Sequence, residues 1–148
     1  MSDTDKTDLT NNGPAETEPH DLGRDLQILV RHQGQTPRER STCGWRDRLI
    51  SREDSRVAAW AHAVDIDGSR PHYHRRAVEL YYVLDGSGVV VLDGVEHPVR
   101  QGSLVHIPPG VVHAARGRMR VFVVGIPDID DDDLFFPEDN PRLNADGD

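Results

Sequence analysis

The sequence has 148 residues, one cysteine and a formal net charge of −9, with 26 acidic residues against 17 lysines and arginines. This length suits one globular domain and is short for two. No apolar stretch approaches the roughly 20 residues of a membrane span, and the polar N-terminus leads us to expect no signal peptide. The single Cys43 excludes an internal disulfide and fits a reducing compartment, so we expect a cytoplasmic protein. A net acidic chain is a poor candidate for binding nucleic acid, because such binding depends on neutralising phosphates.

The charge is unevenly distributed along the chain. Residues 1–23 contain six acids and one base, and residues 128–148 contain nine acids and one base. The intervening residues 24–127 contain 11 acids and 15 bases, all arginine, which gives them a net charge of +4. Acidic segments of low hydrophobicity are typical of disorder. We therefore expect an acidic N-terminal tail at 1–23, one folded domain at 24–127 and an acidic, mostly disordered tail at 128–148. Within the last tail, the apolar triplet 134–136 is expected to dock on the domain or on a second subunit.

Short strand patterns separated by Gly and Pro turns occupy the middle of the chain. An apolar run at 26–30 predicts a first strand, and the Gly-, Pro- and Arg-rich stretch 34–48 is expected to be a loop. Residues 57–66 alternate strictly, which places Trp60 and His62 on one face of a strand. The further strands that the pattern predicts are 79–84, 89–92, 95–100, 104–107, 111–115 and 119–126, with a hairpin turn at Asp93-Gly94. Strands of this length and spacing predict an all-β sandwich or barrel.

Three histidines and one glutamate form the most informative pattern. His72 and His74 are two residues apart, so on an extended strand both imidazoles point to the same face. Glu79 begins the next predicted strand and shares a face with Tyr81, whereas His113 must arrive by tertiary folding. Three imidazoles and a carboxylate suit a divalent transition ion such as Mn, Fe, Co, Ni or Zn and do not suit Ca or Mg.

The segments that carry these residues resemble the two motifs of the cupin superfamily. The stretch from Gly68 to Gly86, which holds the first two histidines and the glutamate, is similar to the first motif. The stretch from Gly102 through Pro108-Pro109-Gly110 to His113 matches the second motif in spacing. Gly68 stands closer to the histidines than the family pattern has it, and Gly117 stands where the second motif often has Asn.

The resemblance covers about residues 55–127 and implies a fold as well as a ligand set. The implied fold is the double-stranded β-helix, or jelly-roll barrel, of small stand-alone bacterial cupins. The implied ligands of one divalent transition metal ion are His72, His74, Glu79 and His113. Thiol-dioxygenase cupins usually lack the motif glutamate, so Cys43 is interpreted as an ordinary loop cysteine.

The same ligand set serves dioxygenases, decarboxylases, isomerases and lyases in the superfamily, so fold and ligands leave the reaction open. The leading hypothesis is a metal-dependent oxidoreductase, isomerase or lyase acting on a small polar or anionic molecule, with dioxygenase, decarboxylase and sugar-phosphate-isomerase-like chemistry unresolved. The alternatives are a sensor or carrier that binds a small ligand without turnover, and a barrel that has lost its metal. Tyr81 and His62 are candidate catalytic groups.

Two further expectations concern partners and tails. Arginines around the first two histidines and after His113 could clamp a substrate carboxylate or phosphate, or could face solvent and pair with the acidic tails. Those arginines are Arg70, Arg75, Arg76, Arg116, Arg118 and Arg120. The run 26–30 suits strand exchange, so a homodimer is expected. Removal of 1–21 and 129–148 is expected to leave metal binding intact.

Overall fold

The computed structural model describes residues 26–51, 53–54, 56–127 and 131–139, and predictions for the rest of the two tails lie outside these residues. The described elements are the strands β1 Arg38–Arg40, β2 Gly44–Ile50, β3 Trp60–Ile66, β4 Val78–Leu92, β5 Val95–Arg100, β6 Leu104–Ile107 and β7 His113–Ile126, and the 3₁₀ helices η1 Asp131–Asp133 and η2 Pro137–Asp139. The strands form one antiparallel sheet in the order β1-β2-β3-β7-β4-β5, with β6 paired to β4.

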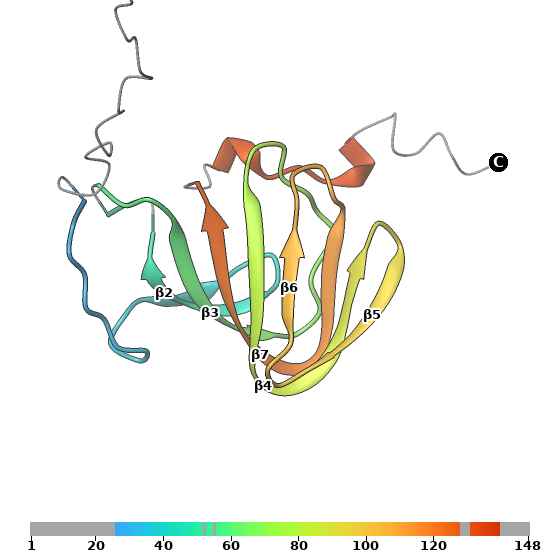
Figure 1. Ribbon diagram of the computed structural model, residues 1–148, viewed down its shortest axis with the longest axis horizontal. Coiled ribbons are helices and arrows are strands. Elements are labelled where there is room, and N and C mark those ends of the chain that lie inside the picture. The colour runs from blue at the N-terminus through green and yellow to red at the C-terminus, as the bar shows by residue number, and fades with distance from the viewer. Residues whose placement is uncertain (1–25, 52, 55, 128–130, 140–148) are drawn as a thin grey trace, which may run out of the picture.

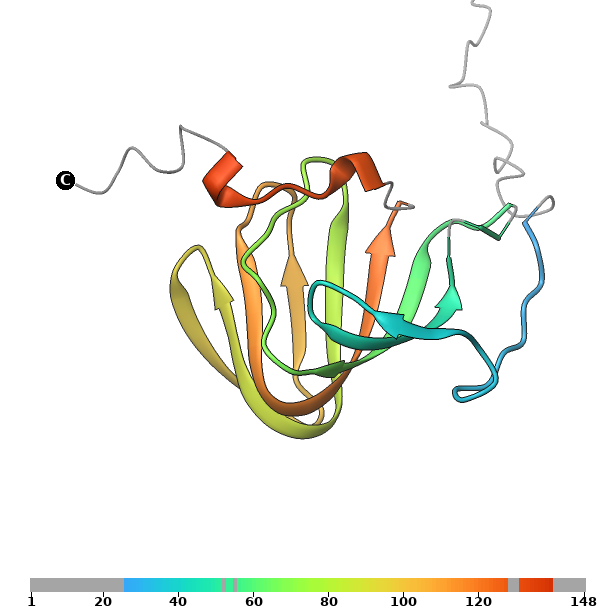
Figure 2. The same cartoon turned by 180° about the vertical axis from the view of Figure 1, so that it is seen from behind.

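The sheet is bent into an open barrel, which confirms the predicted all-β fold (Figure 1). The segment from η1 to η2 lies across its upper rim in that view. In the opposite view, the β1–β2 hairpin and the segment between β3 and β4 lie on the near side (Figure 2). Among the described residues, no helix is long and apolar enough to cross a membrane.

Two strands are longer than the turn signals predicted. Asp85-Gly86 was expected to end a strand, but β4 runs through it with a change of register between Val83 and Asp85. Gly117 was expected to separate two strands, but β7 continues through it. Its φ is +119°, and a Cβ there would lie 2.6 Å from the Cα of Gly88 on β4. These glycines therefore let the long β4–β7 ladder bend at close approach of the two backbones.

The N-terminal part of the domain differs from the prediction in two ways. The stretch 34–48, expected to be a loop, contains β1 and most of β2. The run 26–30, expected to be a strand, belongs to no strand, although its backbone is anchored by a 2.9 Å hydrogen bond from Gln27 N to Arg56 O. Ile28 and Val30 are 92% and 83% exposed. The sheet therefore begins with arginine-rich strands and leaves the apolar run 26–30 outside it.

The barrel interior is filled mainly by alternating residues of the paired strands. The side chains that are almost fully buried include Tyr81, Val83 and Val90 of β4, Ile107 of β6 and Val121 of β7. Burying side chains of this size contributes about 1.5–3 kcal/mol each relative to leaving them exposed. This packing fixes the inner faces of β4 and β7, which carry Glu79 and His113.

Part of the segment predicted as a tail packs against the barrel. Tyr73 and Phe135 exchange backbone hydrogen bonds of 2.9 and 3.0 Å, and their rings stack with centroids 5.5 Å apart. The guanidinium of Arg70 lies 3.6 Å from the ring centroid of Phe136. The apolar triplet 134–136 therefore docks on the barrel of its own chain.

Candidate metal centre

The structure brings together the four residues that the motifs singled out. His72 and His74 lie in the segment before β4, Glu79 near the start of β4, and His113 at the start of β7. His72 and His113 exchange backbone hydrogen bonds of 3.0 and 2.8 Å, which places the two chain segments side by side. All four side chains are buried, and one potential ligand atom from each lies within 4.8 Å of the others.

The three imidazoles share one hydrogen-bonding arrangement. Nδ1 of His72 lies 2.8 Å from the carbonyl oxygen of Arg70, Nδ1 of His74 lies 2.7 Å from that of Asp133, and Nδ1 of His113 lies 3.0 Å from that of Val111. Because a carbonyl oxygen only accepts, each Nδ1 must carry the proton, which leaves a lone pair on Nε2 of the neutral ring. This is the arrangement that orients metal-ligating histidines.

The Nε2 atoms point to a shared space beside the glutamate. Nε2 of His74 and of His113 are buried without a hydrogen-bond partner. They lie 3.7 Å from Oε1 and 2.8 Å from Oε2 of Glu79, the shorter contact being outside hydrogen-bonding geometry. Buried polar atoms are rarely left unsatisfied, so converging lone pairs of this kind are the expected signature of a cation site.

Burial and mutual proximity set the ionisation of this cluster. Burial, reinforced by the neighbouring His113, lowers the pKa of His72 to about 4, so its ring is neutral near pH 7. Burial alone would raise the pKa of Glu79, but the histidines, His113 above all, hold it below its usual value. Burial alone would lower the pKa of His113, but the close carboxylate of Glu79 raises it, so a metal ion bound here would displace the proton that this pair otherwise stabilises.

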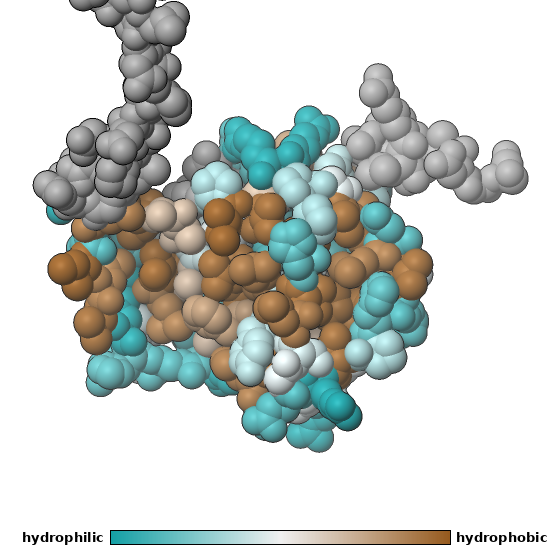
Figure 3. All heavy atoms as spheres, viewed as in Figure 1, coloured by the Kyte–Doolittle hydropathy of each residue, from teal (hydrophilic) through white to brown (hydrophobic). Residues whose placement is uncertain are grey.

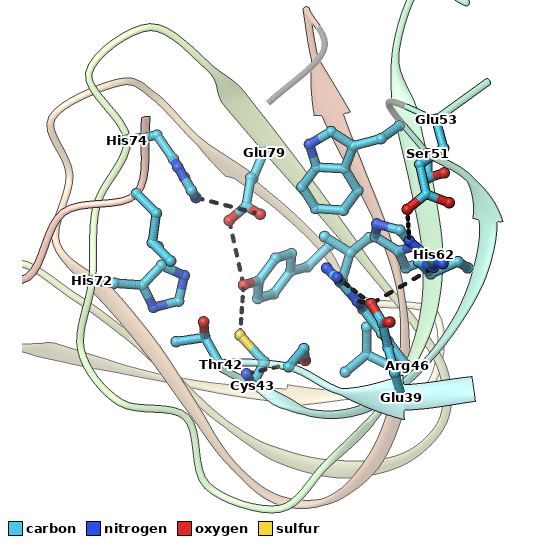
Figure 4. A pocket seen from close by; sticks show the side chains of 17 residues that line it. Glu39, Thr42, Cys43, Arg46, Ser51, Glu53, His62, His72, His74 and Glu79 are labelled. Carbon is cyan, nitrogen blue, oxygen red and sulfur yellow. Dashed lines mark hydrogen bonds and ion pairs between the residues drawn. The ribbon is translucent and has the colours of Figure 1, made fainter. Parts of the chain in front are cut away.

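The cluster opens into a cavity of about 350 Å³, at the small end of the range for ligand sites. Both candidate catalytic groups, Tyr81 and His62, line it, and Figure 4 shows His62 in its wall. The hydroxyl of Tyr81 donates to Oε2 of Glu79 at 3.4 Å, and burial raises its pKa well above the usual value. His62 is 4% exposed, and burial, followed by the nearby Arg46, lowers its pKa to about 3. Tyr81 is thus a protonated donor and His62 a neutral ring.

Residues 64–125 match the sequence family of the cupin domain. This match covers β4, β5, β6 and nearly all of β7, and it contains the whole four-residue cluster. The chain contains a small cupin domain.

Solved structures share this fold. The cupin domain is 26% identical to a protein from Planctomyces limnophilus, with a TM-score of 0.69 over 74% of this chain and 97% of that one. It is 18% identical to the Streptomyces nucleoside dehydratase Pac13, with a TM-score of 0.65 over 77% and 98% of the two chains. At the latter identity the likeness concerns the fold alone.

Curated relatives match over shorter stretches. The dimethylsulfoniopropionate lyase DddW from Ruegeria pomeroyi is 46% identical over 44 residues, which are 30% of this chain and 28% of the relative. An uncharacterised protein from Methanocaldococcus jannaschii is 38% identical over 42 residues, 28% and 34% of the two chains. The matched stretches thus span about a third or less of these relatives.

The arginines that reach the cavity differ from those that the sequence singled out. None of the six arginines near the histidine motifs lines the cavity, and four of them pair with acids: Arg70 with Glu138, Arg76 with Asp132, Arg116 with Glu96, and Arg120 with Asp47 and Asp65. Arg46 and Arg48 of β2 line it instead, with Glu39 and Glu53. Arg46 and Arg48 were not identified from the sequence because residues 34–48 were expected to form a loop. The alternation of these two arginines was the signal that could have indicated a strand.

Cys43 also lies at the cavity, immediately before β2. Its Sγ is 3.7 Å from the hydroxyl of Tyr81, which links it to Glu79 (Figure 4). Burial, with the nearby Glu79, raises the pKa of the thiol to about 12. Cys43 is therefore a protonated thiol in the wall of the cavity and a poor nucleophile at neutral pH.

Asp133 supports the centre from the C-terminal segment. It is 2% exposed, and its carboxylate accepts the backbone N–H groups of Arg75, Arg76 and Ala77 at 2.9–3.2 Å. Its own carbonyl accepts Nδ1–H of His74. Asp133 therefore stabilises the turn after His74 and also orients the His74 imidazole. Nothing in the run of aspartates 130–133 distinguished it in the sequence.

Proposed function

We propose that this cupin domain is a metal-dependent enzyme in which His72, His74, Glu79 and His113 hold one divalent transition ion. The observation that carries the proposal is the convergence of the four buried side chains, whose potential ligand atoms lie within 4.8 Å of one another while Nδ1 of each imidazole lies within 3.0 Å of a backbone carbonyl oxygen. Three nitrogens and one carboxylate fit Mn, Fe, Co, Ni or Zn and leave coordination positions open for substrate.

The protein and the ion would divide the chemistry between them. When bound, such an ion supplies Lewis acidity or, if redox-active, oxygen chemistry. Tyr81 keeps its proton and holds one oxygen of Glu79, so the carboxylate is oriented before substrate arrives. Trp60, Val123 and Leu134 line the cavity and limit access of water to the reacting group. His62 presents a neutral imidazole that can accept or donate a proton at the substrate.

The size and lining of the cavity favour a small polar or anionic substrate. The relatives act on different molecules, one on dimethylsulfoniopropionate and one on a nucleoside. Both belong in a substrate panel with sugar phosphates, keto acids, short dicarboxylic acids and aromatic diols, with product analysis and oxygen uptake recorded in parallel. Turnover of any of these supports an enzyme; saturable binding without product on the full panel would favour a sensor or carrier.

Metal content is the first experiment. Protein purified without added metal is expected to contain about one transition ion per chain by elemental analysis. The double variant His72→Ala/His74→Ala should lose the ion, whereas His97→Ala, which alters an exposed histidine of β5, should retain it. The proposed centre would be refuted if the double variant retained the ion. It would also be refuted if the wild type contained no ion and took up none when metal was added.

We propose further that the protein is a homodimer. The arm at residues 26–30 leaves Ile28 and Val30 exposed without a strand partner in the described chain. Figure 3 shows apolar side chains on this arm and on the outer face of β4, β6 and β7, where Tyr82 and Leu104 are 45% and 65% exposed. Sedimentation of the wild type should give twice the mass of one chain, and the double variant Ile28→Asp/Val30→Asp should give a lower mass. A wild-type mass equal to one chain would refute the dimer.

A further inference from the structure

The cavity carries a second group of polar side chains away from the metal ligands (Figure 4). Three of its lining residues have a buried nitrogen that makes no hydrogen bond: Nε1 of Trp60, Nδ1 of His62 and Nε of Arg48, the last lying 3.6 Å from Oε1 of Glu39. They are close neighbours, because Arg48 of β2 is paired in register with His62 of β3 and the rings of Trp60 and His62 lie 4.5 Å apart. Three nitrogens without a hydrogen bond are thus gathered in one wall.

The chemistry of these nitrogens defines what can satisfy them. An indole N–H and a guanidinium N–H only donate, so the missing partner must be a hydrogen-bond acceptor. His62 has no hydrogen bond to any described residue and can donate as well. Buried donors without partners are unfavourable, and a well-packed domain retains few of them. Their position in the wall of a cavity is explained if a ligand oxygen is the partner.

The charges around the cavity favour an anionic acceptor. Glu39 accepts from Nε of Arg46 at 2.8 Å, and Glu53 accepts from Nη1 of Arg48 at 3.0 Å, so each arginine is neutralised but keeps further N–H groups unused. The charged lining residues comprise these two arginines and three glutamates, Glu79 included. A divalent ion on the centre therefore changes the net charge of the cavity from −1 to +1, which matches a monoanion.

We infer that Arg48, Trp60 and His62 form a recognition subsite for a carboxylate, and that the substrate is a small monocarboxylate reaching from this subsite to the metal. The inference rests on the proposed metal-dependent function, because the ion is the second point of attachment. A dianionic phosphate matches the charge of the cavity less well. The carboxylate oxygens accept from the guanidinium, the indole and the imidazole, and the opposite end of the molecule meets the ion.

The test uses ω-hydroxycarboxylates from glycolate to 5-hydroxypentanoate and their primary amides, titrated calorimetrically into protein of measured metal content. At least one acid should bind about tenfold or more tightly than its amide, since hydrogen bonds to charged groups are worth that much. Trp60→Phe keeps an aromatic ring and removes one donor, and should weaken the acid about tenfold and the amide by less, because a neutral carbonyl oxygen is a weaker acceptor than a carboxylate. His62→Gln should also weaken the acid.

Trp45→Phe is the matched control, because Trp45 is the other tryptophan of the chain and is 45% exposed on β2. It should bind the acid like wild type, and its remaining indole, Trp60, should change fluorescence on binding. Equal affinities for acid and amide, or equal affinities in Trp60→Phe and Trp45→Phe, overturn the subsite even if metal is present. Absence of metal with intact Trp60-dependent acid binding overturns the proposed function and retains the subsite.

Discussion

Replacement of Asp133 by asparagine should weaken metal binding although Asp133 contributes no ligand atom. Its carboxylate oxygens accept three backbone N–H groups just after His74, and its carbonyl orients the His74 ring. These interactions hold the pKa of Asp133 below its usual value despite burial, which alone would raise it. An asparagine turns one acceptor oxygen into a donor that faces backbone donors.

The size of the effect follows from these contacts. Loss of one charge-assisted hydrogen bond and a donor–donor contact should cost about 2–4 kcal/mol in stability of the segment. Changes to groups that orient metal ligands typically lower metal affinity about 10–100-fold, and we expect Asp133→Asn to fall in this range. The matched control is Asp132→Asn, which makes the same change of charge one residue earlier. The Asp132 side chain is 72% exposed and pairs with the Arg76 side chain.

The assay is competition between apo-protein and a chromophoric chelator for Zn²⁺ or Co²⁺. The Co²⁺ absorption spectrum adds a readout of ligand geometry that a loss of stability does not change. Met119→Ala, which opens a cavity at a buried site in the far part of β7, serves as a destabilised control with intact ligands. If Asp133→Asn matched Asp132→Asn in affinity and spectrum, the positioning role of Asp133 would be refuted.

Three other changes test the fold. Met119→Ala should cost about 2–5 kcal/mol in urea unfolding, whereas Leu104→Ala at a site 65% exposed should cost less than about 0.5 kcal/mol. Gly117→Ala should lower the free energy of unfolding by more than an ordinary surface substitution does, because the φ of Gly117 is +119° and the new Cβ would meet the β4 backbone. A loss of less than about 0.5 kcal/mol would contradict this explanation. Arg31 lowers the pKa of Asp54 to about 2, so this partly exposed pair should stabilise the fold by at most about 1 kcal/mol above pH 4 and lose that contribution as the pH falls toward 2. Asp54→Asn should show no such pH dependence.

The metal centre could be predicted from sequence because its ligands obey local rules. His72 and His74 share a face through the two-residue period of an extended chain, and Glu79 opens a β-branched strand that packs inward. His113 could be assigned because the glycine and proline turns before it have the spacing of the second cupin motif. The same turn signals misplaced strand ends at Gly86 and Gly117, since a glycine that permits a bend within a ladder has the same sequence signature as one that ends a strand.

The cavity wall could not be predicted, because its strands lack an apolar inner face. Arg46 and Arg48 alternate on β2 as core residues would, but they point into a polar cavity and pair with Glu39 and Glu53. A search for alternating hydrophobic residues does not detect a strand whose inner face is polar. Asp133 was missed for a different reason, since its three backbone partners belong to a segment more than 50 residues away.

The contacts of Asp133 and Phe135 change the expectation for the C-terminal tail. The sequence favoured removal of residues 129–148 without loss of metal, but such a truncation deletes Asp133 and the strand-like pairing of Phe135 with Tyr73. We now expect it to lower metal affinity at least as much as Asp133→Asn, whereas a truncation after residue 139 should not. Equal metal affinity in the two truncated proteins would show that the segment 131–139 is dispensable.

The charges of the cavity predict that the metal ion binds before an anionic ligand. Two arginines outside the cavity, Arg70 and Arg76, pair with Glu138 and Asp132 of the C-terminal segment, which lowers the positive excess of the domain at its surface. Inside the cavity, Glu79 leaves a net negative charge until a divalent ion is bound. An anion should therefore bind after the metal, and its affinity should fall when the ion is removed by chelation. The neutral amides should lose less affinity than the acids under the same treatment; an equal loss for both would mean that coordination alone, and not the charge of the cavity, governs binding.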